Sequence, residues 1–194
     1  MTHKGTIKIE TERLILRRFT IDDAEAMFRN WANDSEVTKF LTWQPHETID
    51  VTREVVADWV SLYENPGHYS WAIELKSIGE PIGSIAAVRK DDDIQMVHIG
   101  YCIGRKWWRK GYASEALSEL ARFFFEEVGV NRIESRHDPR NPNSGKVMMK
   151  AGLQYEGTHR QSDSNNQGGF CDVSYYAILA EDYFGKTDDA PKVE

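Results

Sequence analysis

Small and basic residues occur together around Gly111, directly before an amphipathic stretch. Residues 109–114 read Arg-Lys-Gly-Tyr-Ala-Ser. A glycine and small residues at the start of a helix let the backbone approach an anion, whose charge the unpaired N–H groups and the helix dipole stabilise. Arg109 and Lys110 add positive charge at the same point. These residues predict a pyrophosphate site, although a solvated basic turn before an ordinary helix fits them equally well.

Two side chains are candidates for a general base. His98 comes first, because histidine ordinarily titrates near pH 6.5 and this one stands two residues before Gly100 on the same face of a predicted strand. Glu134 comes second. It alternates with Ile133 and Ser135, so a solvated face is an equally good interpretation of its position. For His98 the alternative is a hydrogen-bonded or surface histidine.

The two cysteines, Cys102 and Cys171, lie far apart and have no CxxC spacing. The sequence therefore suggests neither a zinc site nor a disulfide framework, and no metal is expected. Neither cysteine has a recognisable histidine partner in sequence, which a covalent route would require to lower the thiol pKa.

A strand, a helix and a second strand must position these residues. The strand is predicted at residues 95–103, from strict alternation, and the helix at residues 111–128, from apolar residues at three- and four-residue spacing. A short strand follows at residues 131–136. This order implies a parallel unit with a right-handed crossover, which places His98 and Glu134 on neighbouring strands.

The other elements predict that the sheet is mixed. Residues 69–75 and 81–88 form a predicted hairpin, which adds antiparallel pairing. The remaining predictions are a strand at 12–18, helices at 21–33, 48–63 and 141–151, and a final strand pair at 153–159 and 171–179 around a polar loop at 160–169.

Composition limits the class of protein. With 194 residues, 40% of them hydrophobic, we expect one domain over residues 1–184 and a disordered tail at 185–194, where apolar content is low. No apolar run approaches the roughly 20 residues of a membrane span, and residues 1–10 lack a signal peptide's apolar stretch, so we expect no membrane partner and a cytoplasmic location. The net charge of −7 argues against nucleic acid and mildly favours a cationic substrate.

Residues 108–113, Trp-Arg-Lys-Gly-Tyr-Ala, resemble the signature Gln/Arg-x-x-Gly-x-Gly/Ala of the GNAT superfamily of N-acetyltransferases. Trp108 occupies the first position of this signature in place of Gln or Arg, as in the branch that resembles RimJ and RimL, the ribosomal-protein N-acetyltransferases. Further similarities to this branch follow in the right order at residues 12–17, 99–101, 141–144 and 150–153.

The resemblance implies an α/β (α+β) GNAT fold, a mixed and mostly antiparallel sheet in which two parallel strands splay around acetyl-CoA. It implies that pyrophosphate is bound by the backbone of Arg109, Lys110, Gly111, Tyr112, Ala113 and Ser114, and pantetheine by that of Tyr101, Cys102 and Ile103. Asn141 and Ser144 then contact pantetheine and the sulfur, although helix capping would also explain them. Met148 occupies the position of the tyrosine acid of many family members, which favours Ser144 as the acid.

The activity implied by the resemblance is direct transfer of an acetyl group to a primary amine, either a protein N-terminus or a small molecule. The first two helices and their connection, which contain Trp31, Trp43 and Trp59, would wall the acceptor site together with Trp71, although core packing is the better interpretation of Trp59 and Trp71. A homodimer is possible. Two alternatives remain. One is a regulatory module that binds acetyl-CoA without turnover, which the missing tyrosine leaves open. The other, a nucleotide-binding α/β protein, is disfavoured because neither GxxxxGK[ST] nor GxGxxG is present.

Overall fold

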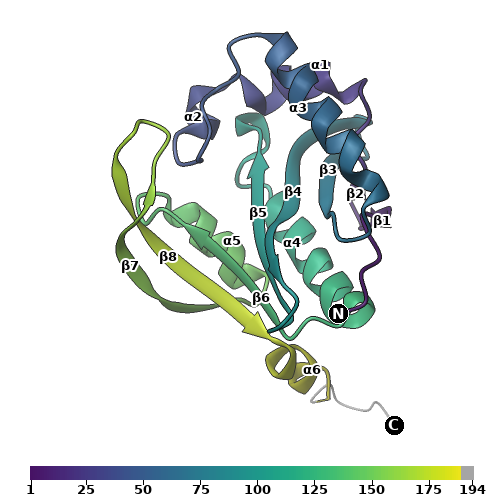
Figure 1. Cartoon of the computed structure of the whole chain (residues 1–194), viewed down its shortest axis with the longest axis vertical. Helices are drawn as coiled ribbons and strands as arrows, with labels where there is room; N and C mark the ends of the chain where they lie inside the picture. Colours follow the sequence, from purple (N-terminus) through teal and green to yellow (C-terminus); the bar gives the residue numbers. More distant parts are fainter. Residues whose placement is uncertain (189–194) are drawn as a thin grey trace.

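One parallel strand pair interrupts an otherwise antiparallel sheet. In the computed structural model, which describes residues 1–188, the strand order is β1-β2-β3-β4-β5-β6-β8-β7, and only β5 and β6 pair in parallel (Figure 1). This confirms the predicted mixed, mostly antiparallel sheet. The strands are β1 (Ile9–Glu10), β2 (Leu14–Arg17), β3 (Ser70–Leu75), β4 (Glu80–Asp91), β5 (Met96–Ile103), β6 (Arg132–His137), β7 (Gln154–Ser164) and β8 (Phe170–Leu179).

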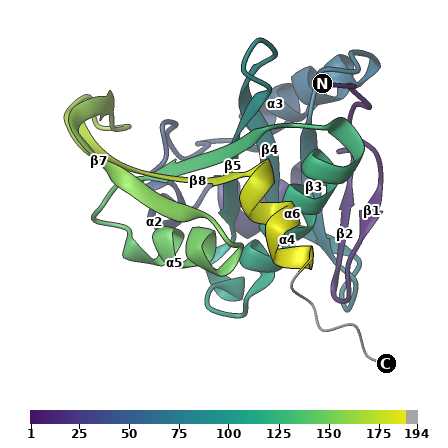
Figure 2. The ribbon, with the colours of Figure 1, turned by 90° about the horizontal axis from the view of Figure 1, so that it is seen from below.

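Helices cover both faces of the sheet. Helices α4 and α5 lie against one face and α3 lies on the other, as Figure 2 shows from below. The α-helices are α1 (Asp23–Met27), α2 (Ser35–Thr38), α3 (Ile49–Ser61), α4 (Tyr112–Phe123), α5 (Pro142–Lys150) and α6 (Ala180–Asp188). Helix α1 continues as the π-helical turn Phe28–Ala32, α3 as the 3-10 turn Leu62–Glu64 and α4 as the π-helical turn Phe124–Val128, and a 3-10 turn spans Arg105–Trp107.

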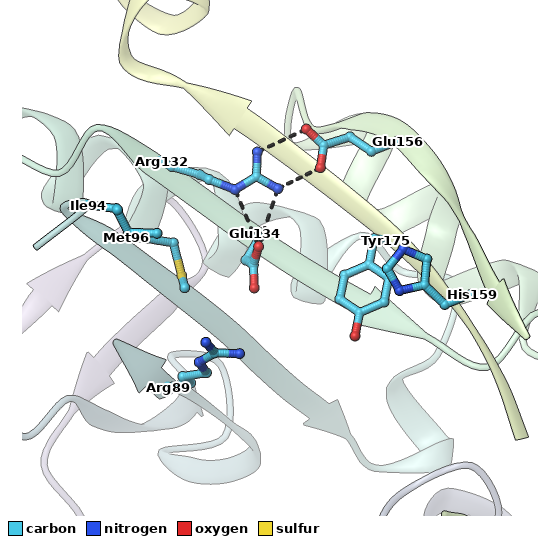
Figure 3. A pocket seen from close by; sticks show the side chains of 8 residues that line it. All are labelled: Arg89, Ile94, Met96, Arg132, Glu134, Glu156, His159 and Tyr175. Atoms are coloured by element: carbon cyan, nitrogen blue, oxygen red, sulfur yellow. Dashed lines mark hydrogen bonds and ion pairs between the residues drawn. The ribbon is translucent and has the colours of Figure 1, made fainter. Parts of the chain in front are cut away.

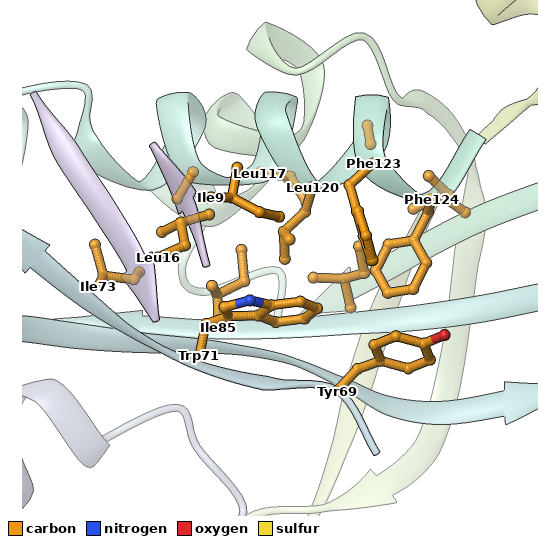
Figure 4. Packing of buried hydrophobic residues seen from close by; sticks show 14 of the residues in the cluster. Ile9, Leu16, Tyr69, Trp71, Ile73, Ile85, Leu117, Leu120, Phe123 and Phe124 are labelled. Atoms are coloured by element: carbon orange, nitrogen blue, oxygen red, sulfur yellow. The ribbon is translucent and has the colours of Figure 1, made fainter. Parts of the chain in front are cut away.

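The larger core lies between the sheet and α4. Strand alternation turns Trp71 and Ile73 of β3 toward Leu117, Leu120 and the residues that follow in α4 (Figure 4), and all four are fully buried. Each such side chain contributes about 1.5–3 kcal/mol through burial. This packing fixes the start of α4 relative to β5, and therefore the loop between them.

A second core lies under α1 and α3, on the opposite face. It contains Trp31 and Val56, and Tyr63 links it to the sheet. The Tyr63 hydroxyl accepts a hydrogen bond from the Phe19 backbone N–H at 2.8 Å and donates one to the Ser70 carbonyl at 3.0 Å. Trp31, which the resemblance placed in the wall of the acceptor site, is therefore a core residue.

Strands β5 and β6 separate soon after they pair. Their register covers only Met96 to His98 of β5 with Arg132 to Glu134 of β6. Beyond this point one side-chain contact joins them, from the Ser135 hydroxyl to the Ile99 carbonyl at 2.7 Å. The pair is therefore splayed toward the start of α4.

Each predicted element is present, but the last hairpin is longer than expected. Strand β7 extends to Ser164 and β8 begins at Phe170, so the first half of the predicted loop 160–169, residues 160–164, is strand. The prediction was wrong because a register shift between His159 and Asp163 hides the alternation, and Gln161, at φ 49°, donates its backbone N–H to the Asp172 carboxylate.

Helix α6 reaches Asp188, four residues into the tail that composition predicted to be disordered. It is anchored by Tyr183, whose ring stacks on Phe125 with centroids 4.8 Å apart. Residues 189–194 of that predicted tail lie outside the described residues. None of the described helices is long and apolar enough to cross a membrane.

Candidate active site

The loop between β5 and α4 exposes free backbone N–H groups. Arg109 and Gly111 have φ values of 62° and 83°, in the left-handed region, and α4 begins immediately afterwards without a side-chain cap. The first bond of the helix runs from the Glu115 N–H to the Gly111 carbonyl, so the preceding amides keep their hydrogen free. Left-handed residues followed by a helix start form a concave cradle for an anion.

Arg13, just before β2, holds this cradle in place. Its guanidinium donates to the Lys110 carbonyl at 2.9 Å, forms an ion pair with Glu115 at 2.6 Å, and lies 4.5 Å from the centre of the Tyr112 ring. No local pattern in the sequence indicates this role, since Arg13 and Glu115 lie 102 residues apart.

Unpaired positive charge surrounds the same loop. Arg109, Lys110 and Lys150 form no ion pair within residues 1–188. A methyl group added at Gly111 would lie 3.3 Å from the Arg13 guanidinium and 3.7 Å from the Lys150 ammonium. The cradle therefore has the amides, the space and the charge that a pyrophosphate group requires.

Trp108, which departs from the predicted signature, fastens the loop to β5. Its indole N–H donates to the Ile103 carbonyl at 2.6 Å. The Ile99 carbonyl faces β6, and the backbone groups of every second strand residue point to the same side. Those of Tyr101 and Ile103 therefore also face the β6 side, at a level where β6 has already separated from β5. The predicted pantetheine-binding segment thus borders the splay, with the Tyr101 amide turned into it.

The Tyr101 side chain connects β5 with α5. Its hydroxyl lies 3.0 Å from both the carbonyl and the hydroxyl oxygen of Ser144. Burial raises the pKa of Tyr101, so the phenol keeps its proton. Asn141, the residue before α5, makes no capping hydrogen bond with its side chain, so helix capping does not account for it. Sequence reasoning assigned Tyr101 only a backbone role and missed its hydroxyl.

His98 and Glu134, predicted as alternatives, are in contact. His98 Nδ1 lies 3.0 Å from Glu134 Oε1, and His98 is 7% exposed. The hydrogen bond from His98 lowers the pKa of the Glu134 carboxyl, while burial opposes this shift. The ionised Glu134 carboxylate accepts a hydrogen bond from the Nδ1–H of His98, which leaves Nε2 of His98 as the proton acceptor. Nε2 has no protein partner within residues 1–188 and keeps contact with solvent.

A pocket of about 470 Å³ opens beside this pair (Figure 3). We call it the β5–β8 pocket. Figure 3 shows Glu134 and Arg89 directed toward its centre, with the rings of Tyr175 and His159 at one side. Its lining residues are Arg89, Ile94, Met96, Arg132, Glu134, Glu156, His159 and Tyr175.

A contact between the β7–β8 tip and the loop after α2 crosses the open end of the splay. The side-chain amide of Asn166 donates to the backbone carbonyls of Thr38 at 2.8 Å and Trp43 at 3.1 Å. The backbone carbonyl of Asn166 accepts a hydrogen bond from the side-chain amide of Gln44. Trp43 is half-buried, and its ring lies 5.3 Å from that of His46. Of the predicted wall residues, Trp43 is therefore the one at the surface of this region.

Neither cysteine has the environment of a nucleophile. Burial raises the pKa of Cys102 and of Cys171, and Cys102, which packs against the second core, has Sγ 3.3 Å from the Ser84 hydroxyl. Among residues 1–188, no three His, Cys, Asp or Glu side chains converge in a way that would hold a metal ion.

The sequence matches the model of the acetyltransferase (GNAT) domain over residues 13–154. It is 34% identical to the uncharacterized N-acetyltransferase YoaA of Bacillus subtilis over 171 residues, 88% of this chain and 96% of that relative. A GNAT-family acetyltransferase from Bacillus anthracis superposes with a TM-score of 0.78 at 30% identity, over 90% of this chain and 99% of that one. RimL, a ribosomal L7/L12 alpha-N-protein acetyltransferase solved with coenzyme A, shares the fold at 20% identity. Its TM-score is 0.79, over 89% of this chain and 98% of the RimL chain.

Proposed function

Because this chain belongs to the GNAT family of acetyltransferases, we propose that it transfers an acetyl group from acetyl-CoA directly to a primary amine. The observation that carries the proposal is the position of the His98–Glu134 pair at the last residues that join β5 and β6, between the anion cradle and the β5–β8 pocket. A proton acceptor, a phosphate site and a pocket for a second substrate are what such a reaction needs.

The cradle is the proposed site for the pyrophosphate. Amides of residues 109–114 would bind it, with Arg109, Lys110 and Lys150 adding charge. The splayed backbone from Tyr101 to Ile103 would hold the pantetheine arm, beside Asn141 and Ser144. When bound, acetyl-CoA supplies an activated acetyl thioester. The CoA-bound neighbour, RimL, supports this placement through its shared fold.

His98 is the proposed general base. A lysine amine titrates near 10.4 and a chain N-terminus near 8, so the acceptor arrives largely protonated and must lose protons to react. Nε2 of His98 takes the proton, and Glu134 holds the ring through Nδ1 and stabilises the imidazolium that results. Glu134 is a positioning residue in this scheme.

Ser144 and Tyr101 act at the other end of the transfer. The reaction forms an N–C bond and breaks the C–S bond, and the departing sulfur keeps the bonding electron pair and needs a proton or a hydrogen bond. The Ser144 hydroxyl donates a hydrogen bond to this thiolate, whose proton comes from solvent, and Tyr101, which stays protonated, fixes the orientation of that hydroxyl. An N–H of β5 in the splay is the natural donor to the carbonyl oxygen.

The first experiment is a calorimetric titration with acetyl-CoA, followed by a thiol-release assay over peptides with free N-termini and small amines. We expect saturable binding and thiol release with at least one amine. Binding without release for every amine would favour a regulatory acetyl-CoA-binding module. No binding would contradict the assignment of the cradle.

A further inference from the structure

The β5–β8 pocket lies one side chain away from the proposed base. Glu134 lines the pocket and also contacts Nδ1 of His98, so one side chain separates a molecule in the pocket from the imidazole that would accept the amine proton. Its volume of about 470 Å³ falls within the range of small-ligand sites, roughly 300–1,000 Å³. The chemistry of its lining therefore bears on which amines can react.

The charges on one side of the pocket already have partners. The Arg132 guanidinium donates to both Glu134, at 3.2 Å, and Glu156, at 2.9 Å. These hydrogen bonds lower the pKa of Glu156, and both carboxylates stay ionised beside one guanidinium. This side presents negative charge that suits an ammonium group.

Arg89 differs from the other charged residues of the lining. It is exposed and has neither a hydrogen bond nor an ion pair within the described part of the chain. It is the cross-strand partner of His98, and residues opposite one another in an antiparallel pair share a face. A register shift between Ala87 and Arg89 produces this alignment, since the extra residue, Val88, turns Arg89 toward the pocket.

The remaining walls limit the shape of an occupant. The rings of His159 and Tyr175 lie 4.7 Å apart, and Arg136 donates to the Tyr175 hydroxyl at 3.3 Å, which fixes that ring. Met96 and Ile94 line the pocket at the start of β5, as Figure 3 shows. The occupant therefore meets aromatic and apolar walls between a free guanidinium and a carboxylate pair.

We propose that this pocket selects amines that carry a carboxylate close to the reacting nitrogen, such as an amino acid or an acidic peptide N-terminus. Arg89 binds the carboxylate, for which its guanidinium geometry is suited, and the amine lies against the His98–Glu134 pair. This inference rests on the proposed function and specifies its acceptor.

The test uses acceptors that differ only in charge. Thiol release is measured with L-aspartate against L-asparagine amide, and with the peptide Asp-Gly-amide against Asn-Gly-amide, for the unmodified protein and for Arg89→Ala and Arg89→Glu. Lys90→Ala is the matched control, because Lys90 is the next cation on β4 and its ammonium lies beside Gly67, away from the pocket. All four proteins should fold, since both side chains are exposed.

We expect the unmodified protein and Lys90→Ala to prefer the carboxylate acceptors by about 10-fold or more in kcat/KM, the effect of one charge-assisted contact. Arg89→Ala should lose the preference and Arg89→Glu should reverse it, with acetyl-CoA affinity unchanged in both. Thiol release without a charge preference, or a preference that survives Arg89→Glu, would overturn the inference alone. No release with any amine would overturn the proposed function and this inference together.

Discussion

Nδ1 of His98 lies 3.0 Å from Oε1 of Glu134, across the last residue pair that joins the two parallel strands. The contact places a carboxylate behind an imidazole, the arrangement that orients a histidine base in many enzymes. It occurs where the strands begin to separate, so the base, the proposed thioester site and the β5–β8 pocket meet at one point.

Replacement of His98 by alanine should lower kcat about 10²–10⁴-fold, the usual contribution of a general base. Acetyl-CoA affinity should hardly change, because the cradle lies at the other end of β5. The loss should be greatest below neutral pH, where the amine is protonated. Glu134→Gln should cause a smaller loss, since the ring of His98 keeps a hydrogen-bond partner. A pH–rate profile that is the same with and without His98 would exclude it as the base.

Glu134 should also make the fold sensitive to acid. Its pKa is lowered in the folded protein, first by the hydrogen bond from His98 and then by Arg132, against the effect of burial. Its ionised form therefore stabilises the fold at pH values above the ordinary glutamate pKa of about 4.3, and this stabilisation is lost as the pH falls through the lower folded value. Near neutral pH, Glu134→Gln should cost on the order of 1–3 kcal/mol of unfolding free energy.

Urea unfolding at a series of pH values checks this prediction. The difference between the unmodified protein and Glu134→Gln should shrink as the pH falls below about 4. Glu156→Gln, at the other side of the Arg132 guanidinium, is a useful comparison because its carboxylate is more exposed. A difference that stays constant from neutral to acid pH would contradict the assignment.

Removal of the Tyr101 hydroxyl should affect turnover more than stability. Tyr101→Phe loses the contacts with Ser144 and should cost about 1 kcal/mol of unfolding free energy. We expect a fall in kcat of about 10-fold, with the KM for acetyl-CoA little changed, because a misoriented Ser144 is a poorer donor. Tyr183→Phe, which loses a hydrogen bond to Glu126 far from the splay, is the control. Equal kcat values for the two variants would argue against a role for Tyr101.

Two glycines with the same backbone conformation allow an effect on stability to be distinguished from an effect on acetyl-CoA binding. Gly111 and Gly129 have φ values of 83° and 77°, so alanine at either position should cost about 1–2 kcal/mol of unfolding free energy. Only Gly111→Ala should also weaken acetyl-CoA binding, by about 10-fold if about 1.4 kcal/mol of binding free energy is lost. The added methyl group at Gly111 points toward the Arg13 and Lys150 side chains, whereas one at Gly129 would face open space. Calorimetry on both variants tests this difference. Equal affinities would place the cradle elsewhere.

Local patterns in the sequence were sufficient for the order of the main elements, and they placed Gly111 at a helix start. Alternation over residues 95–103 and helical spacing over residues 111–128 each depend on a few neighbouring residues. Gly111 lies at the junction of these two patterns, which is why the sequence could indicate the proposed anion site. The strand pair at the end of the chain was predicted less well, because a register shift near Gln161 removes the alternation that would have revealed it.

The sequence by itself thus determined the order of the main strands and helices, and it identified His98 and Glu134 as alternative candidates for the base and Ser144 as a candidate for the acid. Only the tertiary structure decided that His98 contacts Glu134, 36 residues away, that Tyr101 contacts Ser144, 43 residues away, and that Arg89 stands opposite His98. These contacts depend on strand register, on a bulge and on where two parallel strands separate. Register is set by the packing of whole faces against α4 and α5, and no short stretch of sequence carries that information.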